Sequence, residues 1–435
     1  MSVNEKFSFV TEYSELLRET CICATHPSGL TIRVVPKSTA AYAMVLATRY
    51  GSLHTAVPVG DTWVETPQGT AHFLEHQLFG TEDDERFARL GAEVNAYTSY
   101  DRTAYTASCT EHFEEVLTCL LRMVIAPAFG PETVEKERPI IAEEIRMNQD
   151  SPWDRCYANL LQAMYQRPGV RDEICGSEES VSHVTAETLT ACHQAFYRPS
   201  NMVLAVSGPA TPEEVWRVAD SMLADVRRGA PLPTRQTKDE PCEVGRAYTV
   251  QYMPHIDDKA VFCIGVKSRT LPTDPRRRLK KEMTMTILSD MLFSRSGRFY
   301  NELFESGLIA PGFSVDTAQG QGYAMYVLTG EADAPATVFD RFCSYVKDLH
   351  RNGLPREELE RSRRVLYASL VTGFDSPDDI AQSLMNDALD GVSVFDFLEV
   401  AEAITPEDLE MEFRTDFRPD AYTLSVVAAG KSEDD

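Results

Sequence analysis

The stretch His72-Phe73-Leu74-Glu75-His76 decides how this sequence is interpreted, because it places two imidazoles and a carboxylate on one turn of a predicted helix. His72 and His76 are four residues apart, so both rings lie on the same side of that helix. Neutral imidazole is a good zinc ligand, and Glu75 is placed to accept a proton from a water on the metal. The order H-x-x-E-H is the reverse of the commoner H-E-x-x-H. The stretch therefore indicates two candidate zinc ligands and a candidate base for a metal-bound water.

An alternative interpretation is a polar helix face whose histidines hydrogen-bond locally. The flanking residues are apolar and predict a buried segment: Phe73, Leu74, Leu78 and Phe79. Buried imidazoles and a buried carboxylate need partners, which favours a metal ion. A third ligand is required before the motif carries weight.

The segment Pro131–Met147 is predicted to be a helix rich in carboxylates, and Gly130-Pro131 suits its start. Glu137 and Glu144 are seven residues apart and point in nearly the same direction. Glu144 is the predicted third ligand. Glu137 is predicted to orient a ligand or the water from just outside the coordination sphere.

Glu143 is the rival third ligand. It points about 100° away from Glu144, and the residue seven positions before it is Lys136, a poor neighbour for a cation. Acidic helix faces are also common simply because water solvates them. Pro139 removes a backbone donor, so the helix is expected to begin near it or to bend there.

Taken together, these residues resemble the pitrilysin (insulinase-like) family of zinc metallopeptidases, of the inverzincin type, and in particular its short two-domain bacterial members. The resemblance continues in Gly91–Thr98 with Thr103–Tyr105, and in Tyr197–Met202 with Ala205–Gly208. It covers most of residues 20–425 and is strongest from 70 to 210.

The resemblance implies one Zn²⁺ per chain, held by His72, His76 and Glu144, with Glu75 and Glu137 as catalytic residues. It also implies that a short stretch lies on an edge strand beside the metal and binds an extended peptide through its backbone: Asn95, Ala96, Tyr97 and Thr98. Without the family resemblance, residues 95–98 would be interpreted as an ordinary strand that leads into a turn.

The composition fits a globular chain of 435 residues, which is long enough for two domains. The net charge of -25 disfavours nucleic acid or an anionic membrane as a partner and fits a neutral or basic substrate. No run is long enough to span a membrane, and the start lacks the pattern of a signal sequence. The ten scattered cysteines fit reduced thiols and a cytoplasmic location.

The proline- and glycine-rich stretch Arg227–Glu243 indicates a linker, placed at 233–244. The predicted domains are a zinc-binding α+β domain at 1–232 and a second, zinc-free domain of the same fold at 245–435. Each begins with two strand-like runs, and the fold class is two tandem, similar α+β domains.

The two halves can be aligned with each other, which suggests an internal duplication. His72–Phe79 falls on Thr286–Phe293, and Asp150-Ser-Pro152 falls on Asp375-Ser-Pro377. The second half has no convincing zinc ligands at the positions aligned with the site: Thr286, Ser289, Asp290, Ser362 and Ser369.

The predicted function is zinc-dependent endopeptidase activity on peptides or small unfolded polypeptides, including removal of a precursor or leader segment. The alternatives are a non-catalytic scaffold subunit of the same fold and a metal enzyme of another class, such as an amidohydrolase. Family members enclose the substrate between two such two-domain units, so the resemblance implies a second chain, either a copy of this one or a related subunit without zinc ligands.

One departure favours the second kind of partner. Many relatives carry a substrate-binding arginine and tyrosine where this sequence has Phe304 and Phe313. Three residues are candidates to replace them: Arg295, Arg298 and Tyr323.

Overall fold

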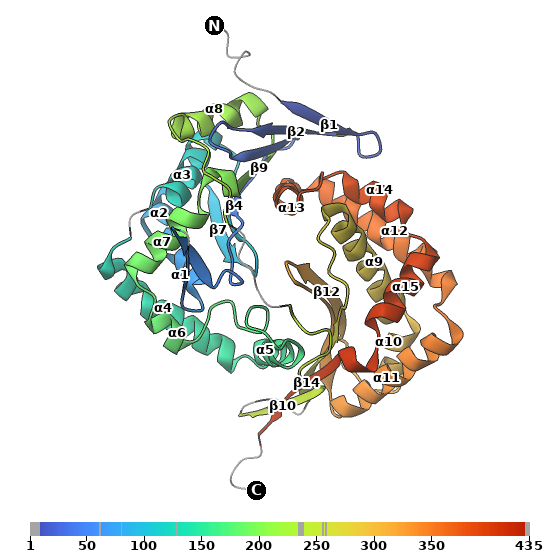
Figure 1. Cartoon of the computed structure of the whole chain (residues 1–435). Helices are drawn as coiled ribbons and strands as arrows, with labels where there is room; N and C mark the ends of the chain where they lie inside the picture. Colours follow the sequence, from blue (N-terminus) through green and yellow to red (C-terminus); the bar gives the residue numbers. More distant parts are fainter. Residues whose placement is uncertain are drawn as a thin grey trace. The chain divides into compact units, whose positions relative to one another are not determined.

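The structure is a computed structural model that describes residues 9–60, 62–79, 81–127, 129–233, 239–254, 256 and 259–430. Within these residues helices pack against two mixed β-sheets, which is the predicted α+β class (Figure 1). The chain forms two compact units. The first contains Met1–Glu143, Ile174–Gln236 and Ser369–Asp396, and the second contains Glu144–Glu173, Thr237–Ala368 and Phe397–Asp435. No helix in these ranges is both long enough and apolar enough to cross a bilayer.

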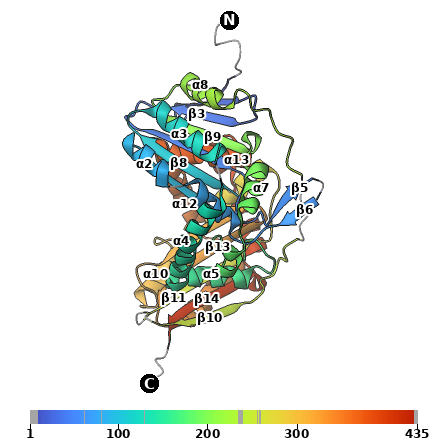
Figure 2. The same cartoon turned by 90° about the vertical axis from the view of Figure 1, so that its left-hand side faces the viewer.

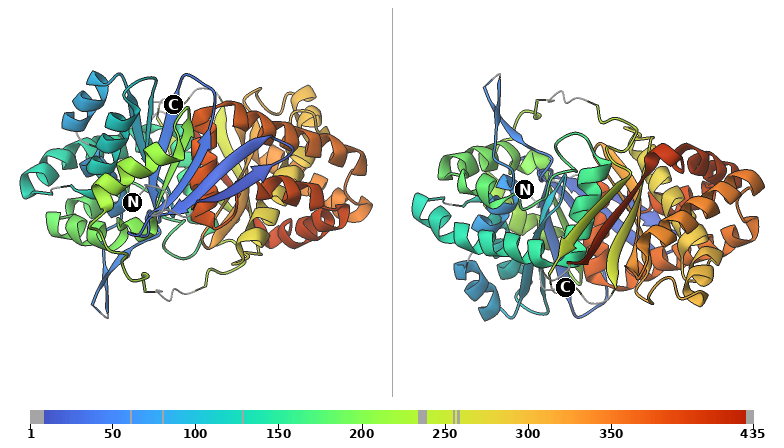
Figure 3. Two further views of the ribbon diagram at one scale, coloured as in Figure 1. Left: turned by 90° about the horizontal axis from the view of Figure 1, so that it is seen from above. Right: turned by 90° about the horizontal axis from the view of Figure 1, so that it is seen from below.

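The first unit is built on a seven-stranded sheet in the order β1-β2-β3-β9-β4-β8-β7. Its strands are β1 (Val10–Ser14), β2 (Glu19–Thr25), β3 (Thr31–Pro36), β4 (Tyr42–Thr48), β7 (Glu93–Thr98), β8 (Thr103–Cys109) and β9 (Met202–Gly208). β9 is apolar and completely buried, as expected for a central strand covered on both faces. The hairpin β1–β2 forms one edge (Figure 3, left), and β7 forms the other. A separate hairpin joins β5 (Ala56–Val59) to β6 (Thr62–Glu65).

The helices of this part of the chain are α1 (Thr70–Leu78), α2 (Thr81–Arg89), α3 (Phe113–Ile125), α4 (Pro131–Asp150), α6 (Glu178–Ser182), α7 (Ala186–Phe196), α8 (Pro212–Leu223) and the 3₁₀ turn η2 (Pro199–Asn201). α4 begins at Pro131, as Gly130-Pro131 predicts, and continues through Pro139, so the expected start near Pro139 is wrong. The division between the compact units falls inside α4, which is one continuous helix.

The second unit is built on a five-stranded sheet in the order β10-β14-β11-β13-β12. Its strands are β10 (Tyr248–Met253), β11 (Ala260–Lys267), β12 (Ser314–Gly320), β13 (Tyr323–Ala332) and β14 (Tyr422–Ala429). Its helices are α9 (Pro275–Phe293), α10 (Arg298–Glu305), α11 (Pro335–Asn352), α12 (Arg356–Thr372), α14 (Asp396–Ala403) and α15 (Pro406–Asp416), with the 3₁₀ turn η4 (Pro419–Ala421). The 3₁₀ turn η3 (Gly373–Asp375) follows α12 and belongs to the first unit.

Without β1 and β2, the first sheet has the same topology as the second, which supports the predicted duplication. In the first sheet the last strand, β9, inserts between β3 and β4, parallel to β3 and antiparallel to β4. In the second sheet the last strand, β14, inserts in the same way between β10 and β11 (Figure 3, right). The sequence predicts paired strands at residues 30–36 and 41–49 and at residues 247–253 and 260–266. These runs form β3 with β4 and β10 with β11, and neither pair is hydrogen-bonded directly, because β9 or β14 lies between the two strands.

A repeated arginine contact strengthens this conclusion. Arg138 on α4 donates to the carbonyls of Val181 and Val184 and pairs with the glutamate three residues before it. Arg363, which the sequence alignment places opposite Arg138, donates to the carbonyls of Glu402 and Ile404 and also pairs with the glutamate three residues before it. Both halves therefore have these contacts, although their residues at the aligned metal-binding positions differ.

The compact units differ from the predicted sequential domains by two helices, which can be followed in Figures 1 and 2. α5 (Pro152–Met164) packs on β10, β11 and β14 of the second sheet, where Asn159 donates a hydrogen bond of 2.8 Å to Gln251. α13 (Pro377–Asp390) packs on β3, β4 and β9 of the first sheet, where Arg49 donates to the carbonyls of Ala388 and Leu389. Periodicity shows that a helix has an apolar face but not which sheet covers it. The sequence aligns these two helices with each other, so each half contributes one equivalent helix to the other's unit.

Candidate active site

The helix α1 starts at a position that only glycine fits. Gly69, just before α1, has φ +83°, and a Cβ added there would lie 2.3 Å from the carbonyl oxygen of Cys175. The close contact with the chain at Cys175 fixes where α1 begins and therefore which way its side chains point. His72 and Glu75 are buried on this helix, with 9% and 8% of their surfaces exposed.

Three side chains with metal-binding atoms come together beside α1. The rings of His72 and His76 lie 4.6 Å apart between centroids, and a carboxylate of Glu144 on α4 joins them. One ligand atom from each of the three lies within 4.8 Å of the others. Two imidazole nitrogens and one carboxylate oxygen form a set that suits zinc in a catalytic site. Glu143, the rival ligand, is exposed and is not part of the group.

Glu137, also on α4, contacts His76. Its Oε1 lies 3.0 Å from Nδ1 of His76. An ionised carboxylate can only accept a hydrogen bond, so Nδ1 carries the hydrogen and the lone pair of Nε2 is left for another partner. A carboxylate behind a ligating histidine fixes the ring and makes it a stronger ligand.

Glu75 is held by the strand next to α1. The hydroxyl of Thr98, at the end of β7, donates a hydrogen bond of 2.7 Å to Oε2 of Glu75. The resemblance implied a substrate-binding role for Thr98, and the structure adds this contact with the carboxylate. The bond fixes one of the two carboxylate oxygens of Glu75.

Two buried tyrosines lie near Glu75. The hydroxyls of Tyr105 and Tyr197 are 2.9 Å apart. Burial chiefly, and the charge of Glu75 in part, raise the pKa of both phenols well above the usual value. Both therefore stay neutral, so neither adds a negative charge beside Glu75.

The stretch Asn95–Thr98 lies on β7, at the edge of its sheet. Only β8 pairs with it among the described strands. Asn95 accepts a hydrogen bond from the backbone N–H of Ala96, and the exposed Tyr97 donates one of 3.0 Å to Gln382 on α13. Thr98 points to α1 and Tyr97 to α13, so the edge of β7 runs between these two helices.

Arg138 fastens α4, which carries Glu137 and Glu144, to its surroundings. Besides its bonds to two carbonyls, its guanidinium lies 6.0 Å from the centre of the Phe73 ring on α1. Sequence reasoning indicates no structural role for Arg138. Its structural role depends on residues more than forty positions away, which no local pattern indicates.

The aligned positions of the second half hold an ion pair. Asp290 on α9, aligned with His76, pairs at 2.8 Å with Arg361 on α12, which precedes the position aligned with Glu137. Within the described residues, no group of three metal-binding side chains occurs in the second half. The positive charge of the guanidinium disfavours a metal cation at this place.

The proposed substitutes for the missing arginine and tyrosine already have structural contacts. Arg295 donates to the carbonyl of Pro311, and Arg298 pairs with Glu302. Phe313 is buried, with 1% of its surface exposed, whereas Phe304 is 44% exposed and stacks on Tyr300. Tyr323 is buried at the start of β13.

Comparison with known proteins assigns the chain to a family. Residues 57–178 match the family described as Insulinase (Peptidase family M16), and residues 183–366 match the domain described as Peptidase M16 inactive domain. An uncharacterized zinc protease of Bacillus subtilis (strain 168), YmfH, is 34% identical over 423 residues, which cover 95% of this chain and 97% of that protein. The chain belongs to the insulinase-like (pitrilysin) family of peptidases, M16, as the resemblance predicted.

Solved structures share the whole fold. An M16-like peptidase from Alicyclobacillus acidocaldarius is 29% identical, with a TM-score of 0.88 over 98% of this chain and 99% of that one. A protease from Helicobacter pylori has the same fold at 18% identity, with a TM-score of 0.81 over 94% and 99% of the two chains.

Proposed function

We propose that this chain is a zinc-dependent endopeptidase whose metal ion is held by His72, His76 and Glu144. The single observation that carries the proposal is that Glu144 of α4 meets His72 and His76 of α1, the helix that also carries Glu75. When bound, the ion would polarise the peptide carbonyl and lower the pKa of a coordinated water. Relatives named zinc proteases support the peptidase class.

In this mechanism the protein groups move the proton. Glu75 accepts it from the attacking water and then delivers it to the leaving amine. Thr98 holds one oxygen of Glu75 in place, and the other oxygen accepts the proton of the attacking water. Glu137 keeps the hydrogen of His76 on Nδ1 and thereby directs Nε2 toward the metal position.

The proposed substrate is an extended peptide or a small unfolded polypeptide, bound as an added strand along Asn95–Thr98. An edge strand offers its unpaired backbone groups to such a chain. Backbone pairing tolerates many side chains, so the proposal includes precursor or leader peptides. The net charge of -25 favours peptides that are neutral or basic.

We further propose that the working enzyme contains a second chain, either a copy or a related subunit without zinc ligands. This rests on the family's two-unit enclosures and on Phe304 and Phe313, which cannot donate the hydrogen bonds of an arginine and a tyrosine. The ten free cysteines fit a reducing compartment, and we propose the cytoplasm.

Glu75→Gln tests the proposal, because it removes the base and leaves all three ligands. The purified variant is expected to keep its zinc, measured by mass spectrometry, and to lose cleavage of a mixture of internally quenched peptides. Cleavage near the parent rate would mean that Glu75 is not the base. A parent chain that purifies without zinc and cleaves nothing would favour the alternative function, a non-catalytic scaffold.

A further inference from the structure

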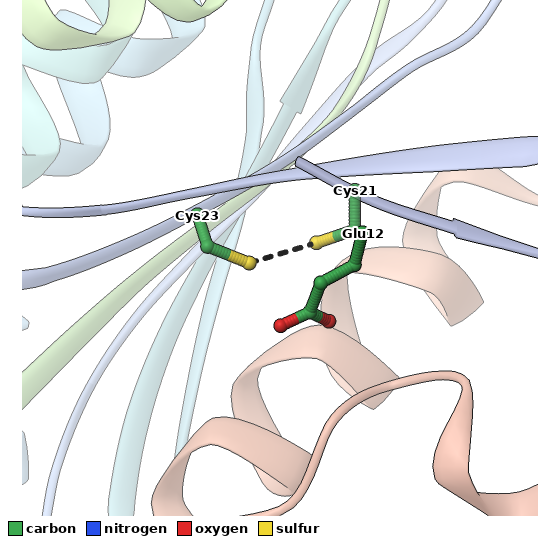
Figure 4. A group of neighbouring side chains, drawn as sticks. All are labelled: Glu12, Cys21 and Cys23. Atoms are coloured by element: carbon green, nitrogen blue, oxygen red, sulfur yellow. Dashed lines mark hydrogen bonds between the residues drawn. The ribbon is translucent and has the colours of Figure 1, made fainter. Parts of the chain in front are cut away.

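A second group of metal-binding side chains lies at the opposite edge of the first sheet from β7. Cys21 and Cys23 are two residues apart on β2, so both sulfurs project from the same face. Glu12 on β1 is directly opposite Cys21 in the strand register. One ligand atom of each residue lies within 4.8 Å of the others, and Figure 4 shows the two sulfurs facing each other beside the carboxylate.

The spacing of the sulfurs suits a tetrahedral ion. Sγ of Cys21 lies 3.7 Å from Sγ of Cys23. Two thiolates at about 2.3 Å from zinc in a tetrahedron lie about 3.8 Å apart, so the observed separation needs almost no change. A buried pair of thiols can also sit at this distance through a weak S–H···S bond, and that is the competing explanation.

A disulfide fits this place less well. The sulfurs would have to approach to about 2.05 Å, and residues two apart on an extended strand have Cα atoms about 6.6 Å apart, close to the upper limit for a disulfide. Binding of a metal ion by both sulfurs requires no change in the extended backbone of β2.

The surroundings fix the carboxylate of Glu12 and bury the two sulfurs. The hydroxyl of Ser393 donates a hydrogen bond to Oε2 of Glu12, which orients this side chain as an outer partner orients a ligand. The sulfurs are shielded from water, since Cys21 is 0% and Cys23 6% exposed.

We propose that Cys21, Cys23 and Glu12 form a second, thiolate-type zinc site, separate from the one proposed for catalysis. Two sulfurs with a carboxylate oxygen suit zinc better than copper(I), which prefers sulfur alone. A fourth position stays open to water. The ion joins the edge strand β1 to β2, and Ser393 extends this link to the segment after α13, so its role is to hold the edge of the first sheet in place.

Cobalt(II) alone, added to the whole metal-free chain under reducing conditions, tests the site. Cobalt bound by thiolates gives a sulfur-to-metal charge-transfer absorption in the near ultraviolet, which histidine and carboxylate ligands do not give. The band is expected in the parent chain and in a His72→Ala variant, and it is expected to disappear in the Cys21→Ser/Cys23→Ser variant. Cys343→Ser, which changes a partly buried thiol outside the group, is the matched control and keeps the band.

The absence of the band, or its survival in the double-serine variant, would overturn the proposal. So would two thiols missing from a titration of the unreduced, unfolded chain, because that result shows a disulfide. If the double variant does not fold, Glu12→Gln and Ser393→Ala decide, since both keep the thiols. Ser393→Ala is expected to weaken cobalt binding roughly 10–100-fold and Glu12→Gln at least as much, and unchanged affinity in both contradicts the site.

Discussion

Replacing Glu137 tests how His76 is prepared to bind a metal ion. The Oε1–Nδ1 distance of 3.0 Å marks an ordinary hydrogen bond between side chains that are 20% and 21% exposed. Removing such a partner of a histidine ligand costs about 10–100-fold in metal affinity, or about 1.4–2.8 kcal/mol. In Glu137→Gln the amide oxygen can still accept from Nδ1–H but the charge is gone, so we expect a loss near tenfold. Glu137→Ala removes both the hydrogen-bond acceptor and the charge, so its loss of zinc affinity should approach about 100-fold.

Zinc affinity of both variants is measured by competition with a chelating fluorophore. Glu132→Gln, an exposed glutamate on the same helix, is the matched control and should bind zinc like the parent. At saturating zinc, peptide cleavage should fall less than affinity, because Glu137 acts through His76. Unchanged affinity in Glu137→Ala would refute the assignment of Glu137 as the residue that positions His76.

Three further outcomes follow from the structure. Glu144→Gln should lower the zinc content sharply and Glu143→Gln should not; the reverse in metal analysis would move the third ligand to Glu143. Gly69→Ala should destabilise the chain by about 1–3 kcal/mol more than Gly91→Ala, because both glycines have positive φ but only a methyl group at Gly69 meets backbone atoms. Equal shifts in Tm would contradict this. Burial, with Asp416 beside it, raises the pKa of Glu412 from 4.5 to about 7, so the folded chain holds a proton that the unfolded chain releases. The free energy of unfolding, relative to Glu412→Gln, should therefore fall by roughly 1–3 kcal/mol between about pH 4.5 and pH 7, and a rise measured by denaturant titration would refute it.

The local parts of the site could be predicted from the sequence. Helical spacing alone places His72 beside His76, and Glu144 in line with Glu137, because four and seven residues bring side chains to one face. Spacing also separates Glu144 from Glu143, since neighbouring residues on a helix point in different directions. The edge position of β7, in contrast, came from the family resemblance and not from any pattern in its residues.

Contacts between distant residues could not be predicted in this way. The bond from Thr98 to Glu75 depends on how β7 lies against α1, and the group formed by Glu12 with Cys21 and Cys23 depends on the register of a hairpin.

The packing of α5 on the second sheet and of α13 on the first sheet has a practical consequence. A chain cut within 233–244 would leave each sheet without one of its helices, so the separated halves are unsuitable for testing the function.

Anomalous diffraction at the zinc absorption edge, from crystals of the whole chain, decides whether the proposed catalytic metal centre exists. The structure predicts a peak about 2.0–2.2 Å from a ring nitrogen of His72, a ring nitrogen of His76 and a carboxylate oxygen of Glu144, with Glu75 close by but not bound. A chain prepared with zinc that shows no peak there, or one bound by Glu143 in place of Glu144, would contradict the proposed site.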